Sequence, residues 1–160
     1  MPHTDGPFGV YDLAILPSGN LLVADRYHLR EVQADGSPVR PFADLTDLRG
    51  VAYDRGTNQV FALEWGNTGT GYFRLLRYDF ATGKILSTTN FTYGNTLVLA
   101  GDGRLVVGSF QKPPGIFDKN LTSHSSFMGE ATAFVTQFNP STPEGAPAQP
   151  ARETPGGGRQ

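Results

Sequence analysis

One pattern occurs three times along the chain, and this repeat limits the available folds more than any other feature. A turn rich in Gly, Asp, Asn or Ser leads into a short apolar run, and a more polar residue then ends the run. The three apolar runs are residues 21–24, 60–63 and 105–107. The residues that end them are Asp25, Glu64 and Ser109, at steps of 39 and 45 residues. A period of ~40–45 residues indicates a repeat architecture.

Each copy carries three further candidate strands, so each repeat predicts a four-stranded unit. The first strands are expected at 10–16, 50–53 and 96–100. The third strands are expected at 29–34, 73–80 and 115–119, and the fourth at 38–43, 85–90 and 123–128. No segment keeps apolar residues at helical spacing over three turns. Four short strands per repeat are typical of a propeller blade. We therefore predict an all-β chain, a β-propeller with about three four-stranded blades.

The polarity of the strands supports this architecture. Inner strands of a blade are covered on both faces, so they read as continuous apolar runs. The fourth strands are more polar and include Pro38 and Pro41, which an edge strand tolerates. A β-sandwich is the competing all-β interpretation, but it does not explain the regular spacing of turn, apolar run and polar residue. The 20 Gly and 12 Pro in 160 residues fit many short strands joined by tight turns.

These repeats divide the chain into two parts. Residues 1–138 are expected to hold the blades, at about 7–46, 47–91 and 92–128, with an extra strand at 130–138. Residues 139–160 are rich in Pro and Gly and have no large apolar side chain, so this tail is expected to be disordered. Three blades are fewer than the four to eight that close a propeller. The chain is therefore expected to be a partial propeller or half of a six-bladed ring.

The composition of the chain limits the classes of partner and of metal site that can be expected. The net charge of −2 gives no electrostatic reason to expect nucleic acid or an anionic membrane as a partner. The absence of cysteine excludes disulfides and thiolate metal sites and leaves the compartment open. We expect no signal peptide, and no window has the ~20 apolar residues that span a bilayer. The three histidines lack the paired spacing of a metal site.

The first repeat resembles an NHL repeat. The matching residues are Pro7, Gly9, Val10, Gly19, Val23, Ala24, Asp25 and Arg30. The second repeat matches at Gly50, Val51, Ala52 and Arg77, and the third keeps the turn and the apolar run. The resemblance implies a six-bladed propeller of the broad class that includes gluconolactonase-like hydrolases and streptogramin-lyase-like enzymes. The Glu-Gly-Pro that opens metal-binding gluconolactonase-like chains is absent, and Asp5-Gly6-Pro7 stands here instead.

Two acids end equivalent strands in adjacent repeats. We expect Asp25 and Glu64 to be structural acids, which accept hydrogen bonds from loop N–H groups and pair with an arginine such as Arg30 or Arg77. A different role is expected near the innermost strands, which line the channel of a propeller. There Asp12 and Asn95 would present oxygen atoms to a hard cation such as Ca²⁺, and no other cofactor is expected.

Three aromatic residues fall in or beside the loops that follow the second strands. Tyr27, Trp65 and Phe110 would form an aromatic rim for a glycan or peptide, or would cover the ends of the blades. Two functional classes follow. The favoured class is a non-catalytic binding or scaffold propeller that presents loops to a protein, peptide or glycan. The alternative is a channel-site hydrolase or lyase, lactonase-like, that uses a Ca-type cation.

The outer blades are expected to lack neighbours on one face. Residues proposed for these faces are Leu13, Ile15, Leu22, Leu97, Leu99 and Val106. At ~25 cal/mol per Å², about 500 Å² of apolar surface is worth on the order of 10 kcal/mol, comparable to the stability of a small domain. Soluble monomers rarely expose such patches. We therefore expect self-association, or further blades from elsewhere, to cover them.

Overall fold

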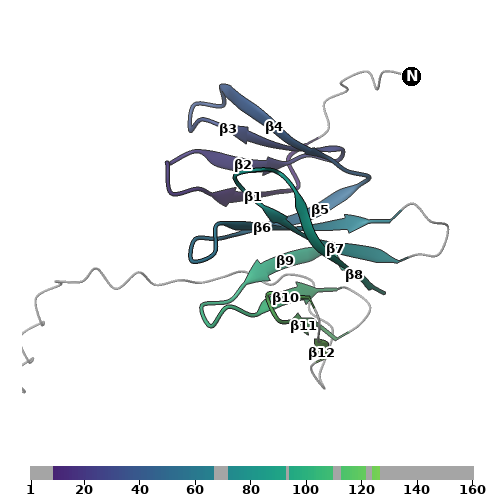
Figure 1. Cartoon of the computed structure of the whole chain (residues 1–160). Coiled ribbons are helices and arrows are strands. Elements are labelled where there is room, and N and C mark those ends of the chain that lie inside the picture. Colours follow the sequence, from purple (N-terminus) through teal and green to yellow (C-terminus); the bar gives the residue numbers. More distant parts are fainter. Residues whose placement is uncertain (1–8, 67–71, 93, 110–112, 122–123, 127–160) are drawn as a thin grey trace, which may run out of the picture.

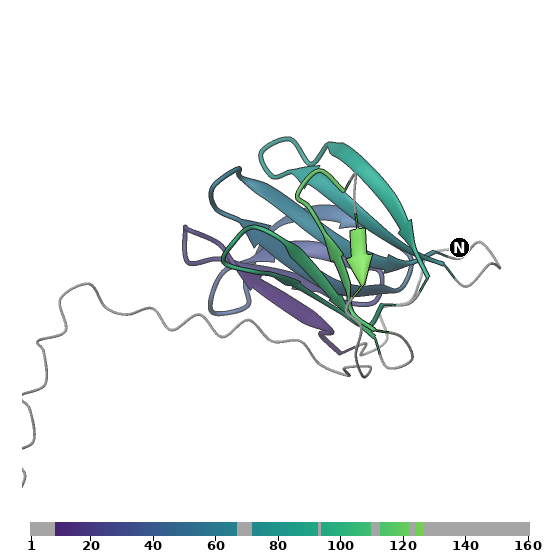
Figure 2. The ribbon, with the colours of Figure 1, turned by 90° about the horizontal axis from the view of Figure 1, so that it is seen from below.

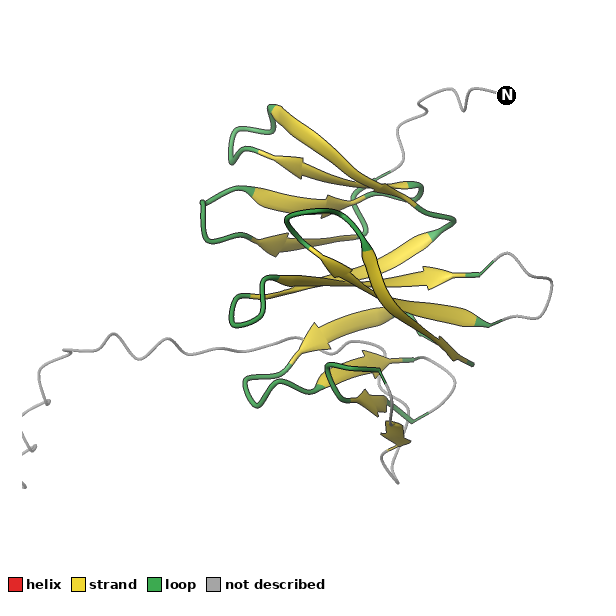
Figure 3. Ribbon diagram, viewed as in Figure 1, coloured by secondary structure: helices red, strands yellow, loops and turns green. Residues whose placement is uncertain are grey.

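The structure is a computed structural model, and it describes residues 9–66, 72–92, 94–109, 113–121 and 124–126. Within these ranges the chain forms twelve β-strands and no helix. Figures 1 and 3 show how the strands are arranged. The predicted all-β class is confirmed. The predicted extra strand at 130–138, the tail 139–160 and Phe110 lie outside the described residues.

The strands form three antiparallel sheets of four, each built from consecutive segments. Blade one holds β1 (Asp12–Ile15), β2 (Leu21–Ala24), β3 (His28–Val32) and β4 (Pro38–Asp44). Blade two holds β5 (Leu48–Asp54), β6 (Gln59–Trp65), β7 (Phe73–Asp79) and β8 (Ile85–Phe91). Blade three holds β9 (Thr96–Leu99), β10 (Leu105–Gly108), β11 (Gly115–Phe117) and β12 (His124–Ser126). The three predicted four-stranded units are thus confirmed, and Figure 2 shows them from a second side.

Small differences from the prediction occur at strand ends. The third strand of blade three ends at Phe117, not at Lys119, because the following residues form a turn. The Asn120 N–H donates to the Asp118 carboxylate at 2.9 Å, and Leu121 takes a φ of 60°. A side-chain oxygen that accepts an N–H two residues ahead competes with the sheet for that backbone. Local turn chemistry therefore ends this strand early.

Two apolar cores lie between the blades. The first joins blade one to blade two and contains Leu16, Leu22, Ala24, Leu29, Leu48, Val51, Val60, Ala62, Leu76 and Tyr78. The second joins blade two to blade three and contains Ala52, Phe61, Leu63, Leu75, Leu97, Leu105, Val107, Phe117 and Leu121. Blade two lies in the middle (Figure 1), so its inner strand β6 is buried on both faces. The outer strands β4 and β8 are largely exposed, as edge strands are expected to be.

The first strands of the three blades lie next to one another, and Gly50 on β5 marks how close they come. A Cβ on Gly50 would lie 2.8 Å from the Cβ of Leu97 on β9 and 3.5 Å from the Asp12 carboxylate on β1. A contact of 2.8 Å between two such atoms is sterically forbidden. Glycine is therefore the residue that lets these strands approach.

Polar contacts link the blades away from the cores. Arg40 of blade one donates to the Phe80 carbonyl of blade two at 2.9 Å. We call the contact between blades one and two the first joint and the contact between blades two and three the second joint. Across the second joint, the Lys119 ammonium lies 2.6 Å from the Asp54 carboxylate, and Arg77 donates to the Lys119 carbonyl at 3.0 Å. These contacts add hydrogen bonds and an ion pair to the apolar packing between neighbouring blades.

Part of the prediction for the open faces is wrong. Leu22 and Leu97 were expected on faces without a neighbour, but both are buried in the cores that flank blade two. Leu99 also packs against the second core. The physical reason is that both faces of these inner strands are apolar, so their hydrophobicity does not reveal which face is covered. Leu13 and Ile15 are exposed, as expected.

Candidate functional site

The candidate site lies at one end of the strands, where β1 begins and where β2, β4 and β6 end. We call this the loop end. Three backbone hydrogen bonds connect its loops. The N–H groups of Leu45, Leu48 and Trp65 donate to the carbonyls of Tyr27, Arg26 and Asp47 at 2.8, 2.9 and 3.1 Å. The loops are therefore tied to one another, and side chains on them are held in place relative to each other.

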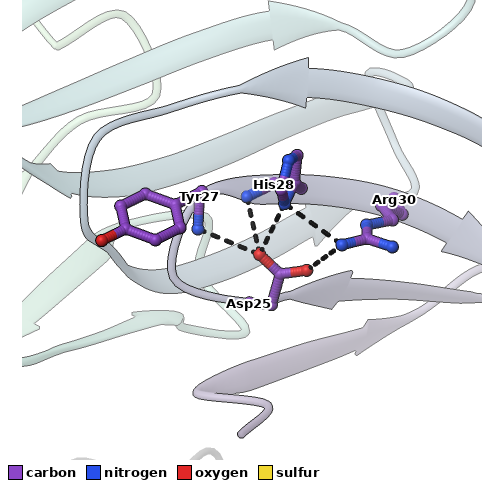
Figure 4. Close-up of polar contacts among 4 residues, drawn as sticks. All are labelled: Asp25, Tyr27, His28 and Arg30. Carbon is purple, nitrogen blue, oxygen red and sulfur yellow. Dashed lines mark hydrogen bonds and ion pairs between the residues drawn. The ribbon is translucent and has the colours of Figure 1, made fainter. Parts of the chain in front are cut away.

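Asp25 organises the loop between β2 and β3 (Figure 4). One carboxylate oxygen accepts the N–H groups of Tyr27 and His28 at 2.9 and 2.8 Å. The other accepts from Arg30 at 2.6 Å. Burial by itself would raise the pKa of Asp25, but these hydrogen bonds, that of His28 and the Arg30 charge outweigh it and lower the pKa. These contacts connect Asp25 to three residues of the same loop and of β3, and its role as a structural acid stays a prediction.

Glu64 occupies the matching position of blade two and is almost fully buried, with 1% of its surface exposed. Its carboxylate accepts the Thr46 N–H at 2.5 Å and a two-pronged contact from Arg74, with Nε at 3.0 Å and Nη2 at 2.5 Å. The arginine differs from the expected one. Glu64 lies opposite Arg74 in the register of β6 and β7, whereas Arg77 lies further along the strand and contacts blade three.

Asp47 lies between two arginines on the loop from β4 to β5. Its carboxylate accepts from Arg49 at 2.7 Å and lies 3.5 Å from the Arg26 Nε. The residue takes a φ of 54°, a backbone state that Asp adopts more readily than most residues. Two guanidinium groups face one carboxylate, so this group of three carries a net positive charge.

Two aromatic rings flank the Arg49 guanidinium. Its Cζ lies 5.3 Å from the ring centroid of Tyr11 and 5.6 Å from that of Trp65. Trp65 also stacks on Phe73, with centroids 6.0 Å apart and ring planes 16° apart. Tyr11 and Trp65 nevertheless remain 47% and 44% exposed. We use the name rim cluster for Tyr11, Arg26, Asp47, Arg49 and Trp65.

The sequence pointed to Trp65 and missed its neighbours. Tyr11 and Arg49 are equivalent positions, each one residue before the strand positions Asp12 and Gly50 that pair with the end of the second strand. Their matching positions in two repeats are a signal from which Arg49 could have been grouped with Tyr11. The contact itself joins two different blades, and local sequence does not encode it.

Tyr27 lies on the same loop end but outside the Arg49 contact. Its ring meets His28 edge to face at 6.5 Å, and the Arg26 guanidinium lies 5.4 Å from its centroid. Arg26 belongs to the rim cluster, so its contact with the Tyr27 ring places Tyr27 beside this cluster. Phe110, the third residue of the predicted aromatic rim, lies outside the described residues.

The proposed cation ligands lie on the first strand of blade one (Asp12) and immediately before the first strand of blade three (Asn95). One Asp12 carboxylate oxygen accepts the Leu13 N–H and the other accepts the Val51 N–H, both at 2.9 Å. Burial raises the pKa of Asp12, and these two hydrogen bonds oppose the rise. Asn95 precedes β9, where its N–H donates to the Gly108 carbonyl at 2.8 Å. Among the described residues, no group of three or more His, Cys, Asp or Glu side chains is arranged to hold a metal ion.

Comparison with solved structures identifies the fold class. The chain superposes on hydrazine synthase from Kuenenia stuttgartiensis with a TM-score of 0.61 at 8% identity, over 81% of this chain and 39% of that one. It superposes on the Pan2 WD40 domain of Neurospora crassa with a TM-score of 0.55 at 12% identity, over 73% and 36%. The third solved structure is that of a Thermus thermophilus protein proposed to be an oxidoreductase (glucose dehydrogenase). It matches with a TM-score of 0.60 at 17% identity, over 72% and 45%.

These likenesses show a β-propeller fold and nothing finer, because the identities are low. The chain spans 36% to 45% of the length of the three solved chains. No protein-family model and no curated protein sequence matches it. The described residues contain no helix long and apolar enough to cross a membrane.

Proposed function

We propose that this chain is a non-catalytic binding or scaffold propeller whose loop end holds a protein, peptide or glycan ligand. The observation that carries the proposal is the rim cluster. Trp65 and Tyr11 stay about half exposed although Arg49 and Phe73 hold them in fixed orientations. Trp, Tyr and Arg are the residues that contribute most to binding interfaces.

The rim cluster is also prepared for binding before any ligand arrives. Asp47 and the stacked rings restrict the rotamers of Arg49 and Trp65, so less conformational entropy is lost when a ligand binds. A flat aromatic surface beside a guanidinium suits sugar rings and peptide side chains alike. Tyr27 extends this surface along the first blade, and Phe110 is proposed to extend it on the third.

The proposal is tested by screening the purified chain on glycan and peptide arrays, with Trp65→Ala as the test variant. Ile85→Ala is the matched control, because Ile85 is also exposed and lies at the start of the edge strand β8. We expect spots bound by the wild type to be lost with Trp65→Ala and kept with Ile85→Ala. Binding that survives Trp65→Ala, or a wild type that binds no array, would overturn the proposal.

Two finer statements belong to this proposal. The first blade is NHL-like, which the residues from Pro7 to Arg30 support, and the Asp25–Arg30 contact gives two of them a structural role. Self-association is also part of the proposal, because a half ring presents half of a rim. Protein partners are in keeping with the class, since the Pan2 neighbour is a WD40 domain.

The alternative function is a channel-site hydrolase or lyase that uses a Ca-type cation through Asp12 and Asn95. The observation in its favour is that Asp12 lies on β1 beside β5, among the first strands that would line a channel. Calorimetric titration with calcium chloride tests it. Heat of binding that disappears in Asp12→Asn would support the alternative, and the absence of binding heat in the wild type would remove it.

A further inference from the structure

Blade one has an apolar face that no described residue covers. Leu13 and Ile15 on β1 are 48% and 61% exposed. Their register partners on the same face are Val23 and Leu21 on β2, and Leu21 in turn pairs with Val32 on β3. These three are partly exposed as well. The row from Ile15 through Leu21 to Val32 is therefore apolar across three strands, and the row from Leu13 through Val23 ends at Arg30 on β3.

The register of the sheets shows what this face would normally contact. In each blade one residue of the first strand pairs with the residue just before Asp25, Glu64 or Ser109, and these first-strand residues are Asp12, Gly50 and Thr96. The next residues, Leu13, Val51 and Leu97, are therefore equivalent. Val51 and Leu97 are buried against the preceding blade. Leu13 has the same side-chain direction and apolar character, but none of the described residues covers it as a preceding blade would.

Blade three carries the complementary face. Val98, Val106 and Ile116 are register partners across β9, β10 and β11, and all three are partly exposed. In blade two the residues equivalent to the first two are Ala52 and Phe61, which are buried against the following blade. One end of the chain thus has a face shaped to receive a preceding blade, and the other end has a face shaped to receive a following one.

We propose that a second copy of this chain covers both faces, with blade three of each copy packed on blade one of the other. The two faces are different and complementary, so such contacts are head-to-tail, and they close when two copies form a ring. Two copies supply six blades, within the four to eight that close a propeller.

The proposal rests on the self-association included in the proposed function, and it goes further by defining where the ring closes. In the second joint Gly50 approaches Leu97, and in the first joint Asp12 bonds to Val51. In both joints the contact runs from the Asp12-equivalent position of one blade to the Leu13-equivalent position of the next blade. The matching contact between two copies joins Thr96 of one copy to Leu13 of the other.

The chain has no cysteine, so introduced cysteines report this contact without background. Disulfides form when the two Cβ atoms come within about 3.5–4.5 Å. We would mix Leu13→Cys with Thr96→Cys under mild oxidation and measure the covalent dimer on a non-reducing gel. Ile85→Cys replaces Thr96→Cys in the control mixture, because Ile85 is exposed on the edge strand β8.

We expect Leu13→Cys to link to Thr96→Cys at least tenfold faster than to Ile85→Cys or to itself. Self-linking of Leu13→Cys at the same rate would show a back-to-back contact of blade one and overturn the ring. Equal rates in all mixtures would do the same. Should a cysteine variant not fold, sedimentation of Ile15→Asp decides: a lower mass than wild type supports the contact, and an unchanged mass overturns it. Failure here would leave array binding by the rim cluster unaffected, so the two proposals are distinguishable.

Discussion

The face of blade two that meets blade three and the outer face of blade one have the same chemistry but different surroundings. Phe61 and Leu63 are completely buried between blades, whereas Leu13 and Ile15 are 48% and 61% exposed. All four are large apolar residues on inner strands of a blade. The difference teaches that burial in this fold is set by the presence of a neighbouring blade and not by the hydrophobicity of the strand. Three kinds of substitution test this comparison, taken from the largest expected effect to the smallest.

The largest effect is expected in the covered core. Phe61→Ala removes a fully buried ring between blades two and three and should lower the free energy of unfolding by about 3–5 kcal/mol. Ile15→Ala on the open face should change it by about 0.5 kcal/mol or less under conditions where the chain is monomeric. Urea unfolding at low protein concentration measures both. Similar losses for the two variants would mean that the face of blade one is covered within the chain.

A smaller effect should separate the two equivalent acids. Glu64→Gln removes the charge from a buried carboxylate that holds Arg74 and the Thr46 N–H, so we expect a loss of about 2–3 kcal/mol. Asp25→Asn keeps an acceptor in a more exposed loop of blade one and should cost about 1 kcal/mol. Urea unfolding of both variants at neutral pH gives the comparison. A larger loss for Asp25→Asn would contradict the expectation that the acid buried in the central blade contributes more to stability.

The smallest effect concerns the two joints and their pH dependence. Burial alone would raise the pKa of Asp54, but hydrogen bonds from Lys119, Thr57 and Gly56 and the Lys119 charge outweigh it, so the pKa is lowered. A lowered pKa means that Asp54 contributes stability above its unfolded pKa of about 3.9, and that this contribution is lost as the pH falls through the folded value. Burial raises the pKa of Asp12 in the first joint, so its contribution has the opposite sign and favours the folded state as the pH falls.

Unfolding free energies measured from about pH 6 down to about pH 2.5 should therefore depart from those of the wild type in opposite directions for two variants. Asp54→Asn should lose less stability on acidification than the wild type, because it lacks the group whose contribution disappears. Asp12→Asn should lose more. Parallel curves for both variants and the wild type would show that neither carboxylate couples a joint to pH.

The sequence predicted the strands well because the signals for them are local. β2 was expected at 21–24 and is found at Leu21–Ala24, since a turn precedes its apolar run and Asp25 follows it. Which face of a strand is buried could not be predicted. In the run Leu21–Leu22–Val23 both alternating sets of side chains are apolar, so the pattern is the same for either orientation. The misplacement of Leu22 and Leu97 follows directly from this ambiguity.

The candidate site was predictable in part for a similar reason. Asp25 and Glu64 end local repeats, and their positions alone suggested acids that hold loops. The partner of Glu64 depends on the register between β6 and β7, which spacing in the sequence does not fix, so Arg74 was missed. The contact of Arg49 with Tyr11 joins residues from two blades and needs the packed structure to be seen.

The mass of the purified chain in solution tests the central claim most directly, because we propose that a second copy covers the faces of blades one and three. Light scattering coupled to size-exclusion chromatography should give twice the chain mass of 17.3 kDa, at micromolar concentration and neutral pH. The same sample should show a β-sheet circular dichroism spectrum. A folded, soluble species of 17.3 kDa would contradict the account, since both apolar faces would then be stable in water.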